Sequence, residues 1–309
     1  MKQVLEGLHN TAVVFREGSA PEHLLELDYW KRILHLLQAR LSAEQLGGLY
    51  FQLVFGNASL AAAPEPGYTN VFIIADEYQQ PRPDLYDGQN IIFQSSYSGK
   101  VFKGLYDKIF PFPIGFNGKL DLENPLPFAE RPVNVFFSGN LHKGRRRMFG
   151  YYSYLRYLPF ALQHRLQARL RSTYDHKYPQ SYLRFTSGFM QGLNFEQYAD
   201  YIKQSKIVLT PHGSLAEECF RHYEAMKCGC IIISERLPEN YFFSESPIIQ
   251  IDNWAEGDRI IKQLLADPAR MQALHEEAMR WWREVMSEPA VAGYMQARIE
   301  AHYQLEQPV

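Results

Sequence analysis

The chain has 309 residues, of which 46% are hydrophobic and 21% are charged, and it contains 20 Tyr and 20 Phe. This composition supplies enough apolar surface for folded cores and excludes an intrinsically disordered protein, and the length predicts two domains. The formal net charge of -2 provides no broad basic field and argues against nucleic acid as a partner, so any phosphate binding must be local.

The N-terminal segment and the cysteines indicate a reducing compartment. Glu6 and His9 interrupt the first apolar residues, so neither a signal peptide nor a membrane span is expected. The chain has three cysteines, Cys219, Cys228 and Cys230. Their odd number and their position in one short stretch fit neither a disulfide framework nor a zinc site. We therefore expect a cytoplasmic protein with no metal site and no transmembrane segment, and leave peripheral membrane contact open.

The first half of the chain alternates short apolar runs with one amphipathic pattern, which is typical of a parallel sheet covered by helices. The amphipathic helix is expected over residues 24–41. Strands are expected at residues 12–15, 50–55, 70–75, 90–94 and 108–110. We expect residues 1–116 to form a Rossmann-like domain on the acceptor side. Residues 111–132 carry five prolines, Gly115 and Gly118 without a sustained period, and we expect residues 117–132 to be an interdomain linker.

The second half repeats the alternation over residues 133–285. Strands are expected at residues 133–137, 182–185, 207–210, 230–234 and 248–251. Helices are expected at residues 145–171, 195–204, 216–227 and 256–265. This succession predicts a second Rossmann-like domain with right-handed crossovers. The helical pattern of residues 268–304 has a break near Pro289, and we expect residues 286–309 to pack back on the N-terminal domain.

The most informative pattern lies in residues 207–234. An apolar strand ends in the turn 211–214 (Pro-His-Gly-Ser), and loops at such positions present backbone N–H groups to anions, so this turn is a candidate phosphate site. On the expected helix that follows, Glu217, Arg221 and Glu224 fall at i, i+4 and i+7 along one stripe. Such a stripe is either a salt-bridged solvent face or a ligand site, and the apolar strands on both sides of the helix favour the ligand site.

Four segments, in order and well spaced, resemble the nucleotide-sugar-binding region of the exostosin-like glycosyltransferases, which have the GT-B fold. The segments are 135–140 (Val-Phe-Phe-Ser-Gly-Asn, followed by arginines), 209–213 (Leu-Thr-Pro-His-Gly), 220–225 (Phe-Arg-His-Tyr-Glu-Ala) and 229–234 (Gly-Cys-Ile-Ile-Ile-Ser). The resemblance covers roughly residues 133–265. His212 stands where the family usually has arginine.

The resemblance implies two Rossmann-like domains that face each other across a cleft, with a nucleotide-sugar on the C-terminal one. It implies that Glu224 accepts hydrogen bonds from the ribose hydroxyls, while Arg221 and the turn Gly213-Ser214 face the diphosphate. Negative charge accumulates there as the glycosidic bond breaks, and each preorganised cation or N–H donor contributes about 3–4 kcal/mol. Further donor-binding candidates are Gly139, Arg145, Arg146, Arg147 and His212.

Two missing motifs bear on the mechanism. Metal-dependent glycosyltransferases hold a divalent ion with Asp-x-Asp, and no such tripeptide occurs in the chain, so side chains and helix dipoles would replace the ion. No cofactor is expected, because the nucleotide-sugar is a substrate. Many retaining enzymes of this fold carry glutamates eight residues apart, but Ala225 and Met226 stand eight residues after Glu217 and Glu218. The resemblance therefore points to an inverting reaction.

An inverting displacement needs a base that takes the proton of the acceptor hydroxyl, and we expect this base in the first domain. Asp76 and Glu77 follow an apolar strand at its carboxyl end and are the candidates. The alternative is that Asp76 caps a turn and Glu77 is solvated. Tyr97 and the pair Ser95-Ser96 are candidates for the acceptor side.

These features predict a glycosyltransferase, a hexosyl- or pentosyltransferase, that moves a sugar from a UDP-sugar to a glycan, a glycolipid or another hydroxyl acceptor. One alternative is a nucleotide-sugar epimerase on the same fold, which would convert its substrate without an acceptor. Another is a non-catalytic protein that binds sugar or nucleotide. The joint presence of Arg221, Glu224 and Gly213 argues against the second alternative, since a scaffold does not need that combination.

Overall fold

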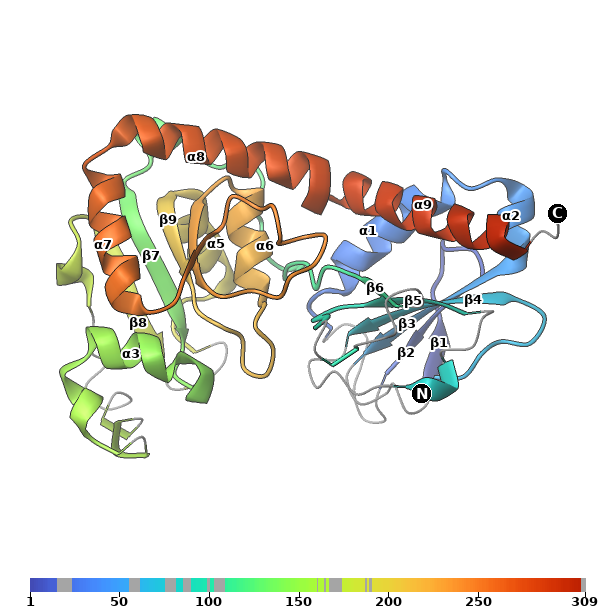
Figure 1. The fold of residues 1–309 in the computed structure, drawn as a ribbon, viewed down its shortest axis with the longest axis horizontal. Coiled ribbons are helices and arrows are strands. Elements are labelled where there is room, and N and C mark those ends of the chain that lie inside the picture. The colour runs from blue at the N-terminus through green and yellow to red at the C-terminus, as the bar shows by residue number, and fades with distance from the viewer. Residues whose placement is uncertain are drawn as a thin grey trace. The chain divides into compact units, whose positions relative to one another are not determined.

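The computed structural model describes residues 1–15, 24–55, 62–75, 82–85, 90–98, 101–102, 109–159, 161–163, 165–166, 174–186, 188 and 191–306. The chain forms two compact α/β units (Figure 1). The first unit consists of Met1–Gly118, Pro238–Ser244 and Arg283–Val309, and the second of Lys119–Leu237 and Glu245–Trp282. Among the described residues, no helix is both long and apolar enough to cross a bilayer.

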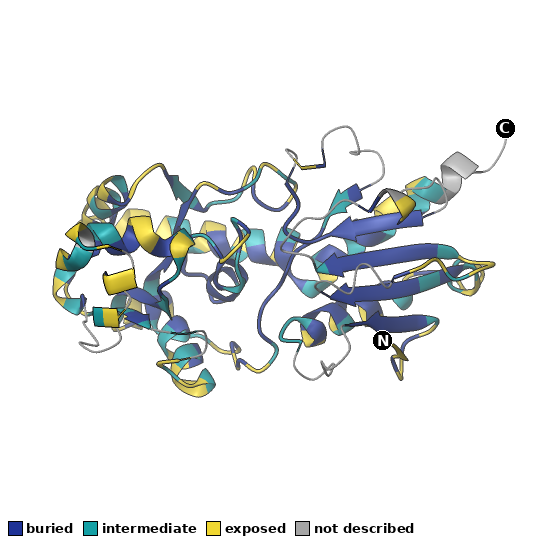
Figure 2. Ribbon diagram, turned by 90° about the horizontal axis from the view of Figure 1, so that it is seen from below, coloured by how far each residue is buried: buried dark blue, intermediate teal, exposed yellow. Residues whose placement is uncertain are grey.

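The sheet of the first unit has its six strands in sequential order. They are β1 (Lys2–Val4), β2 (Thr11–Val14), β3 (Leu49–Phe55), β4 (Thr69–Ala75), β5 (Asn90–Gln94) and β6 (Ile109–Pro111). β1 runs antiparallel to β2, and all other neighbours are parallel. The strands from β2 to β5 are almost wholly buried, as their near-continuous apolar sequences require of a sheet covered on both faces (Figure 2).

Two helices that pack against each other cover part of this sheet. The helical elements of the first unit are α1 (Leu27–Gln38), α2 (Ala43–Gly48), η3 (Pro83–Leu85) and α9 (Glu288–Glu306). The apolar face of α1 buries Trp30 and Ile33 completely. α9 packs against α1, and the hydroxyl of Tyr29 donates a hydrogen bond of 2.7 Å to the carbonyl of Met286 just before α9.

The sheet of the second unit has the order β11-β10-β9-β7-β8 and is parallel throughout. Its strands are β7 (Val133–Asn140), β8 (Ser181–Thr186), β9 (Ser205–Thr210), β10 (Ile231–Glu235) and β11 (Ile249–Ile251). The chain adds β8 on one side of β7 and then returns to add β9 on the other side. The strand order therefore reverses between β7 and β9, and in open α/β sheets ligands bind beyond the carboxyl ends of strands at such a point.

The helical elements of the second unit are η4 (Phe128–Glu130), η5 (Lys143–Arg145), α3 (Arg146–Tyr152), η6 (Tyr154–Tyr157), η7 (Asp175–Lys177), α5 (Phe195–Lys203), α6 (Phe220–Lys227), α7 (Trp254–Leu265) and α8 (Pro268–Trp281). A π-helical turn, η8 (Trp282–Met286), follows α8. The C-terminal helix is interrupted at η8 and at the bend of Ser287, two residues before Pro289, so the expected break near Pro289 is confirmed. The proline itself fits the first turn of α9.

Several expected helices differ from the sequence pattern, and the one expected over residues 24–41 spans only Leu27–Gln38. The helix expected over residues 145–171 is interrupted after Tyr152, because Ser153 adopts an extended conformation and its side chain caps η6 by accepting from the N–H of Leu155. Residues 161–163 and 165–166 are helical again. The helix expected over residues 216–227 begins only at Phe220, after an N-terminal cap at Cys219.

The segment expected to be a linker is instead packed into the second unit from Lys119 onward. Arg131 is buried, and its guanidinium donates hydrogen bonds of 2.9 Å to the carbonyl of Ser205 and 2.6 Å to that of Cys228. These bonds tie residues 119–132 to the second sheet. The second unit is also interrupted by Pro238–Ser244, which belongs to the first.

Candidate functional site

The loops after β7 and β9 meet beyond the carboxyl ends of these strands, at the point where the strand order reverses. A Cβ atom built on Gly144 would lie 2.8 Å from the carbonyl oxygen of Gly213, so the two loops are in contact. A Cβ on Gly213 would in turn lie 2.6 Å from the carbonyl oxygen of Glu218. Only glycine fits these close approaches, and they bring the expected phosphate turn against the segment that follows β7.

Two buried guanidinium groups, those of Arg145 and Arg221, lie side by side at this edge. Arg145 is 7% exposed and Arg221 6% exposed. A Cβ on Gly139 would be 2.5 Å from Nη1 of Arg145 and 3.1 Å from Nη2 of Arg221, so the absence of a side chain there admits both groups. Both also lie over the ring of Phe137, with their Cζ atoms 5.9 and 5.0 Å from its centroid.

The hydrogen bonds of these two arginines leave N–H groups unused. Arg145 Nη1 donates to the carbonyl and the side-chain oxygen of Asn140, at 3.0 and 2.8 Å. Arg221 donates from Nη2 to the carbonyl of Ser138 and from Nε to the hydroxyl of Tyr198. In the part of the chain that the structure describes, Nε of Arg145 and Nη1 of Arg221 are buried without a hydrogen-bond partner. An unpaired buried donor costs about 1–3 kcal/mol, and more when charged, so these groups indicate an anionic ligand.

Both guanidinium groups remain charged near neutral pH. Burial and the neighbouring charge of Arg221 lower the pKa of Arg145 to about 10. Burial opposes the charge of Arg221, but Tyr198, Cys219 and Glu224 outweigh this effect and raise its pKa above the ordinary value. Two adjacent cations with unused donors form the local positive field that a diphosphate requires.

Glu224 balances this charge through a bridging tyrosine. The hydroxyl of Tyr198, on α5, donates to Oε2 of Glu224 at 3.0 Å and accepts from Nε of Arg221 at 3.1 Å. Burial raises the pKa of Tyr198, so its hydroxyl stays protonated. Arg221 and Glu224 are both buried, so they form a network with Tyr198 and not a solvent face. Glu217 precedes the start of α6 and is not part of the predicted stripe.

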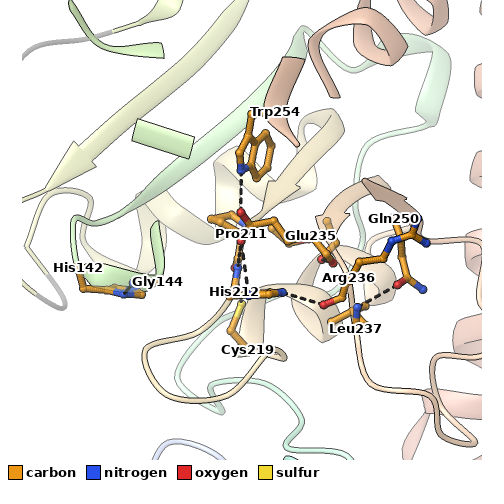
Figure 3. Close-up of polar contacts among 12 residues, drawn as sticks. His142, Gly144, Pro211, His212, Cys219, Glu235, Arg236, Leu237, Gln250 and Trp254 are labelled. Atoms are coloured by element: carbon orange, nitrogen blue, oxygen red, sulfur yellow. Dashed lines mark hydrogen bonds and ion pairs between the residues drawn. The ribbon is translucent and has the colours of Figure 1, made fainter. Parts of the chain in front are cut away.

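The loop after β9 is anchored by a carboxylate that we did not single out in the sequence (Figure 3). Glu235, the last residue of β10, is buried and accepts from the backbone N–H of His212 at 3.1 Å and from Nε1 of Trp254 at 3.0 Å. The ring Nε2 of His212 lies 2.7 Å from the carbonyl of Arg236. The position of Glu235 at the end of an apolar strand is a signal that could have identified this residue.

His222 is a second residue that we did not single out. It is fully buried on α6, with Nε2 2.8 Å from Oγ of Ser234 and Nδ1 3.1 Å from the backbone nitrogen of Cys219. Burial lowers its pKa to about 4. The neutral ring therefore fixes the N-terminal end of α6.

The remaining predicted site residues are exposed in the second unit, belong to the first unit or lie outside the described residues. Ser214 and Arg147 are exposed, Arg147 on α3. Ser95, Ser96 and Tyr97 are buried after β5 in the first unit. Asp76 and Glu77 lie outside the described residues. Within the described ranges, His, Cys, Asp and Glu side chains form no group of three or more that could hold a metal ion.

Acidification should lower the free energy of unfolding through His222. Its folded-state pKa of about 4 lies below the unfolded value of 6.5, so the neutral ring contributes stability above pH 6.5 that is lost as the pH falls toward 4. Between pH 7 and pH 5 we expect this residue to remove about 2 kcal/mol from the free energy of unfolding. Urea unfolding of wild type and His222→Asn at both pH values tests this, since the variant should lose correspondingly less. Equal losses would contradict the assignment.

Comparisons with known proteins bear on the fold. Residues 158–298 match a family model described as glycosyl transferase-like. The fold resembles that of sucrose-phosphate synthase from Thermosynechococcus elongatus, with a TM-score of 0.51 and 14% identity over 93% of this chain and 81% of that chain. The chain has the GT-B fold.

Two further structures are similar to the same degree. The UDP-forming α,α-trehalose-phosphate synthase of Burkholderia vietnamiensis has a TM-score of 0.52 and 11% identity over 93% of this chain and 79% of that one. The corresponding protein of Burkholderia xenovorans has a TM-score of 0.51 and 10% identity over 89% and 78%. No curated protein matches the sequence.

Proposed function

We propose that the protein is a glycosyltransferase that moves a sugar from a UDP-sugar to a hydroxyl acceptor, a glycan or a glycolipid. The observation that carries this proposal is the pair of buried guanidinium groups with unused N–H donors, Arg145 and Arg221, at the reversal of strand order. The GT-B fold and the match of residues 158–298 to a glycosyl transferase-like model support it. The name UDP-forming, carried by two proteins of similar fold, supports uracil as the base of the donor.

In this proposal the two arginines receive the diphosphate and stabilise the charge that grows on it as the glycosidic bond breaks. Their donors are fixed before the substrate arrives, because Asn140, Ser138 and Tyr198 hold both guanidinium groups in place. The backbone of the turn 213–214 faces the same diphosphate.

Glu224 is proposed to accept hydrogen bonds from the ribose hydroxyls, as the resemblance to exostosin-like enzymes implies. Glu224 is 3% exposed, and its carboxylate already accepts from Tyr198. A ribose would therefore have to reach the carboxylate next to the tyrosine hydroxyl, and Glu224 would serve both the ribose and the position of Arg221.

The finer mechanism is also a proposal. The missing glutamate pair supports inversion, and Asp76 or Glu77 would be the base that deprotonates the acceptor. Asp76→Asn and Glu77→Gln should then abolish transfer while leaving UDP affinity nearly unchanged. Wild-type turnover in both variants would place the base elsewhere.

Sugar transfer in the presence of excess EDTA tests the proposed reaction. UDP-sugars labelled in the sugar are incubated with a panel of hydroxyl acceptors, and transferred label is measured with and without the chelator. We expect transfer to persist, because two guanidinium groups take the place of a divalent ion on the diphosphate. Activity that is lost in EDTA and restored by manganese or magnesium would contradict the metal-free mechanism. Conversion of the donor without any acceptor would instead indicate an epimerase.

A further inference from the structure

The three cysteines differ sharply in their surroundings. Cys228 and Cys230 are fully buried, and burial raises the pKa of Cys230 to about 11 and that of Cys228 well above its ordinary value. Since the thiolate is the nucleophile, both side chains are unreactive. Cys219 is partly exposed and free. Of the three cysteines, only Cys219 is partly exposed to solvent.

Cys219 lies against the proposed diphosphate turn. Its Cβ is 3.6 Å from the position that a Cβ on Gly213 would take, and its Sγ is 3.9 Å from the carbonyl oxygen of Pro211 (Figure 3). It is also the N-terminal cap of α6, two residues before Arg221. A group attached to this sulfur would therefore occupy space at the turn.

The unpaired N–H donors of Arg145 and Arg221, which indicate an anionic ligand, belong to the same cluster as Cys219. Arg221 follows Cys219 by two residues on α6. Arg145 follows Gly144, which contacts the turn at Gly213. Arg145 Nε and Arg221 Nη1 are buried and, among the described residues, have no partner. Cys219 therefore lies next to a site whose unpaired donors indicate an anionic ligand. This indication of a ligand does not depend on the cysteine.

His222 holds Cys219 in this position. The ring Nδ1 accepts from the backbone N–H of Cys219, so the ring proton resides on Nε2 and is donated to Oγ of Ser234 at 2.8 Å. Sγ of Cys219 lies 3.5 Å from the same Nδ1. Because the ring is buried and bonded at both nitrogens, it fixes the backbone of Cys219 beside the turn at Gly213.

We propose that Cys219 is a site of covalent modification, and that modification and donor binding exclude each other; the second part rests on the proposed function. The natural reagent would be hydrogen peroxide: the sulfur attacks one of its oxygens, the O–O bond breaks, the thiol is oxidised to a sulfenic acid and the second oxygen leaves as water. With iodoacetamide, the sulfur displaces iodide and forms a thioether. Either product places new atoms next to Gly213.

Labelling of the full chain with iodoacetamide, followed by peptide mass spectrometry, tests both parts. We expect Cys219 to be carbamidomethylated at least ten times faster than Cys228 or Cys230, which serve as internal controls. Saturating UDP or inorganic pyrophosphate should slow this labelling at least fivefold. Dimedone should trap a sulfenic acid at Cys219 after treatment with hydrogen peroxide. Labelling of Cys219 no faster than that of the buried pair, or the absence of a dimedone adduct, would overturn the site.

The affinity for UDP, measured by calorimetry before and after labelling, tests mutual exclusion. Wild type should lose at least ten-fold in affinity after labelling, whereas Cys219→Ser should show the same affinity before and after treatment. UDP that binds wild type but neither slows labelling nor is weakened by it would overturn the inference and leave the proposed function standing. Protection by pyrophosphate without any binding of UDP would support the inference and contradict the proposed function.

Discussion

Arg221→Ala is expected to lower kcat for sugar transfer by about two orders of magnitude or more. Its guanidinium is already positioned by Ser138 and Tyr198, and its buried Nη1 has no partner among the described residues. The charge on the leaving diphosphate is larger in the transition state than in the bound donor. Removing the cation should therefore reduce kcat beyond any loss of affinity. Steady-state kinetics with the preferred UDP-sugar measure both quantities.

Three further variants make this result specific. Arg145→Ala should resemble Arg221→Ala, because both groups flank Gly139. Arg147→Ala removes the same charge from the exposed surface of α3 and should leave kcat within twofold. Arg221→Lys keeps the charge without the planar set of donors and should fall between wild type and alanine. A normal kcat for both Arg145→Ala and Arg221→Ala would exclude this cluster as the diphosphate site.

Glu224→Ala is expected to weaken UDP binding at least tenfold and to reduce the free energy of unfolding by about 3 kcal/mol. The carboxylate is the buried counterion of Arg221 through the hydroxyl of Tyr198. Its loss leaves a buried cation without compensation and, if the ribose role holds, removes an acceptor for two hydroxyls. Melting curves and calorimetry with UDP measure the two effects separately.

A double-mutant cycle separates the ribose role from a structural one. If Glu224 acts only through Arg221, Glu224→Ala combined with Arg221→Ala should bind UDP no worse than Arg221→Ala alone. If Glu224 also contacts the ribose, the double variant should be weaker still. Tyr198→Phe removes the bridging hydroxyl and keeps both charges, so it should reproduce the loss of stability more than the loss of affinity. Wild-type affinity in Glu224→Ala would contradict both roles.

The sheets are largely predictable from the sequence because buried parallel strands are continuous apolar runs. The strand expected at residues 90–94 coincides with β5, and the other nine expected strands overlap strands of the structure. β1 is not predictable in this way, since Lys2–Val4 is exposed and has no apolar run. The long helix expected from residue 145 fails at Ser153, where a polar side chain caps the next turn in place of continuing the helix.

The candidate site is predictable only in part. Arg221, Glu224 and Gly213 follow one another within a single strand-to-helix segment, so their proximity is a local property of the sequence. Tyr198 connects the two charged residues from a different helix, and no local pattern reveals that contact. Likewise Glu235 reaches back to the loop at His212 from the neighbouring strand, through a pairing that only the folded sheet provides.

Binding of UDP and of uridine to the wild-type protein tests the central claim most directly, because the two ligands differ only in the diphosphate. Calorimetry should give a dissociation constant for UDP at least 100-fold lower than that for uridine, a difference of about 2.7 kcal/mol. In Arg221→Ala this ratio should fall by at least tenfold, while the affinity for uridine stays within a few-fold. Equal affinities for UDP and uridine in wild type, or a ratio that the substitution leaves unchanged, would contradict a diphosphate site at Arg145 and Arg221.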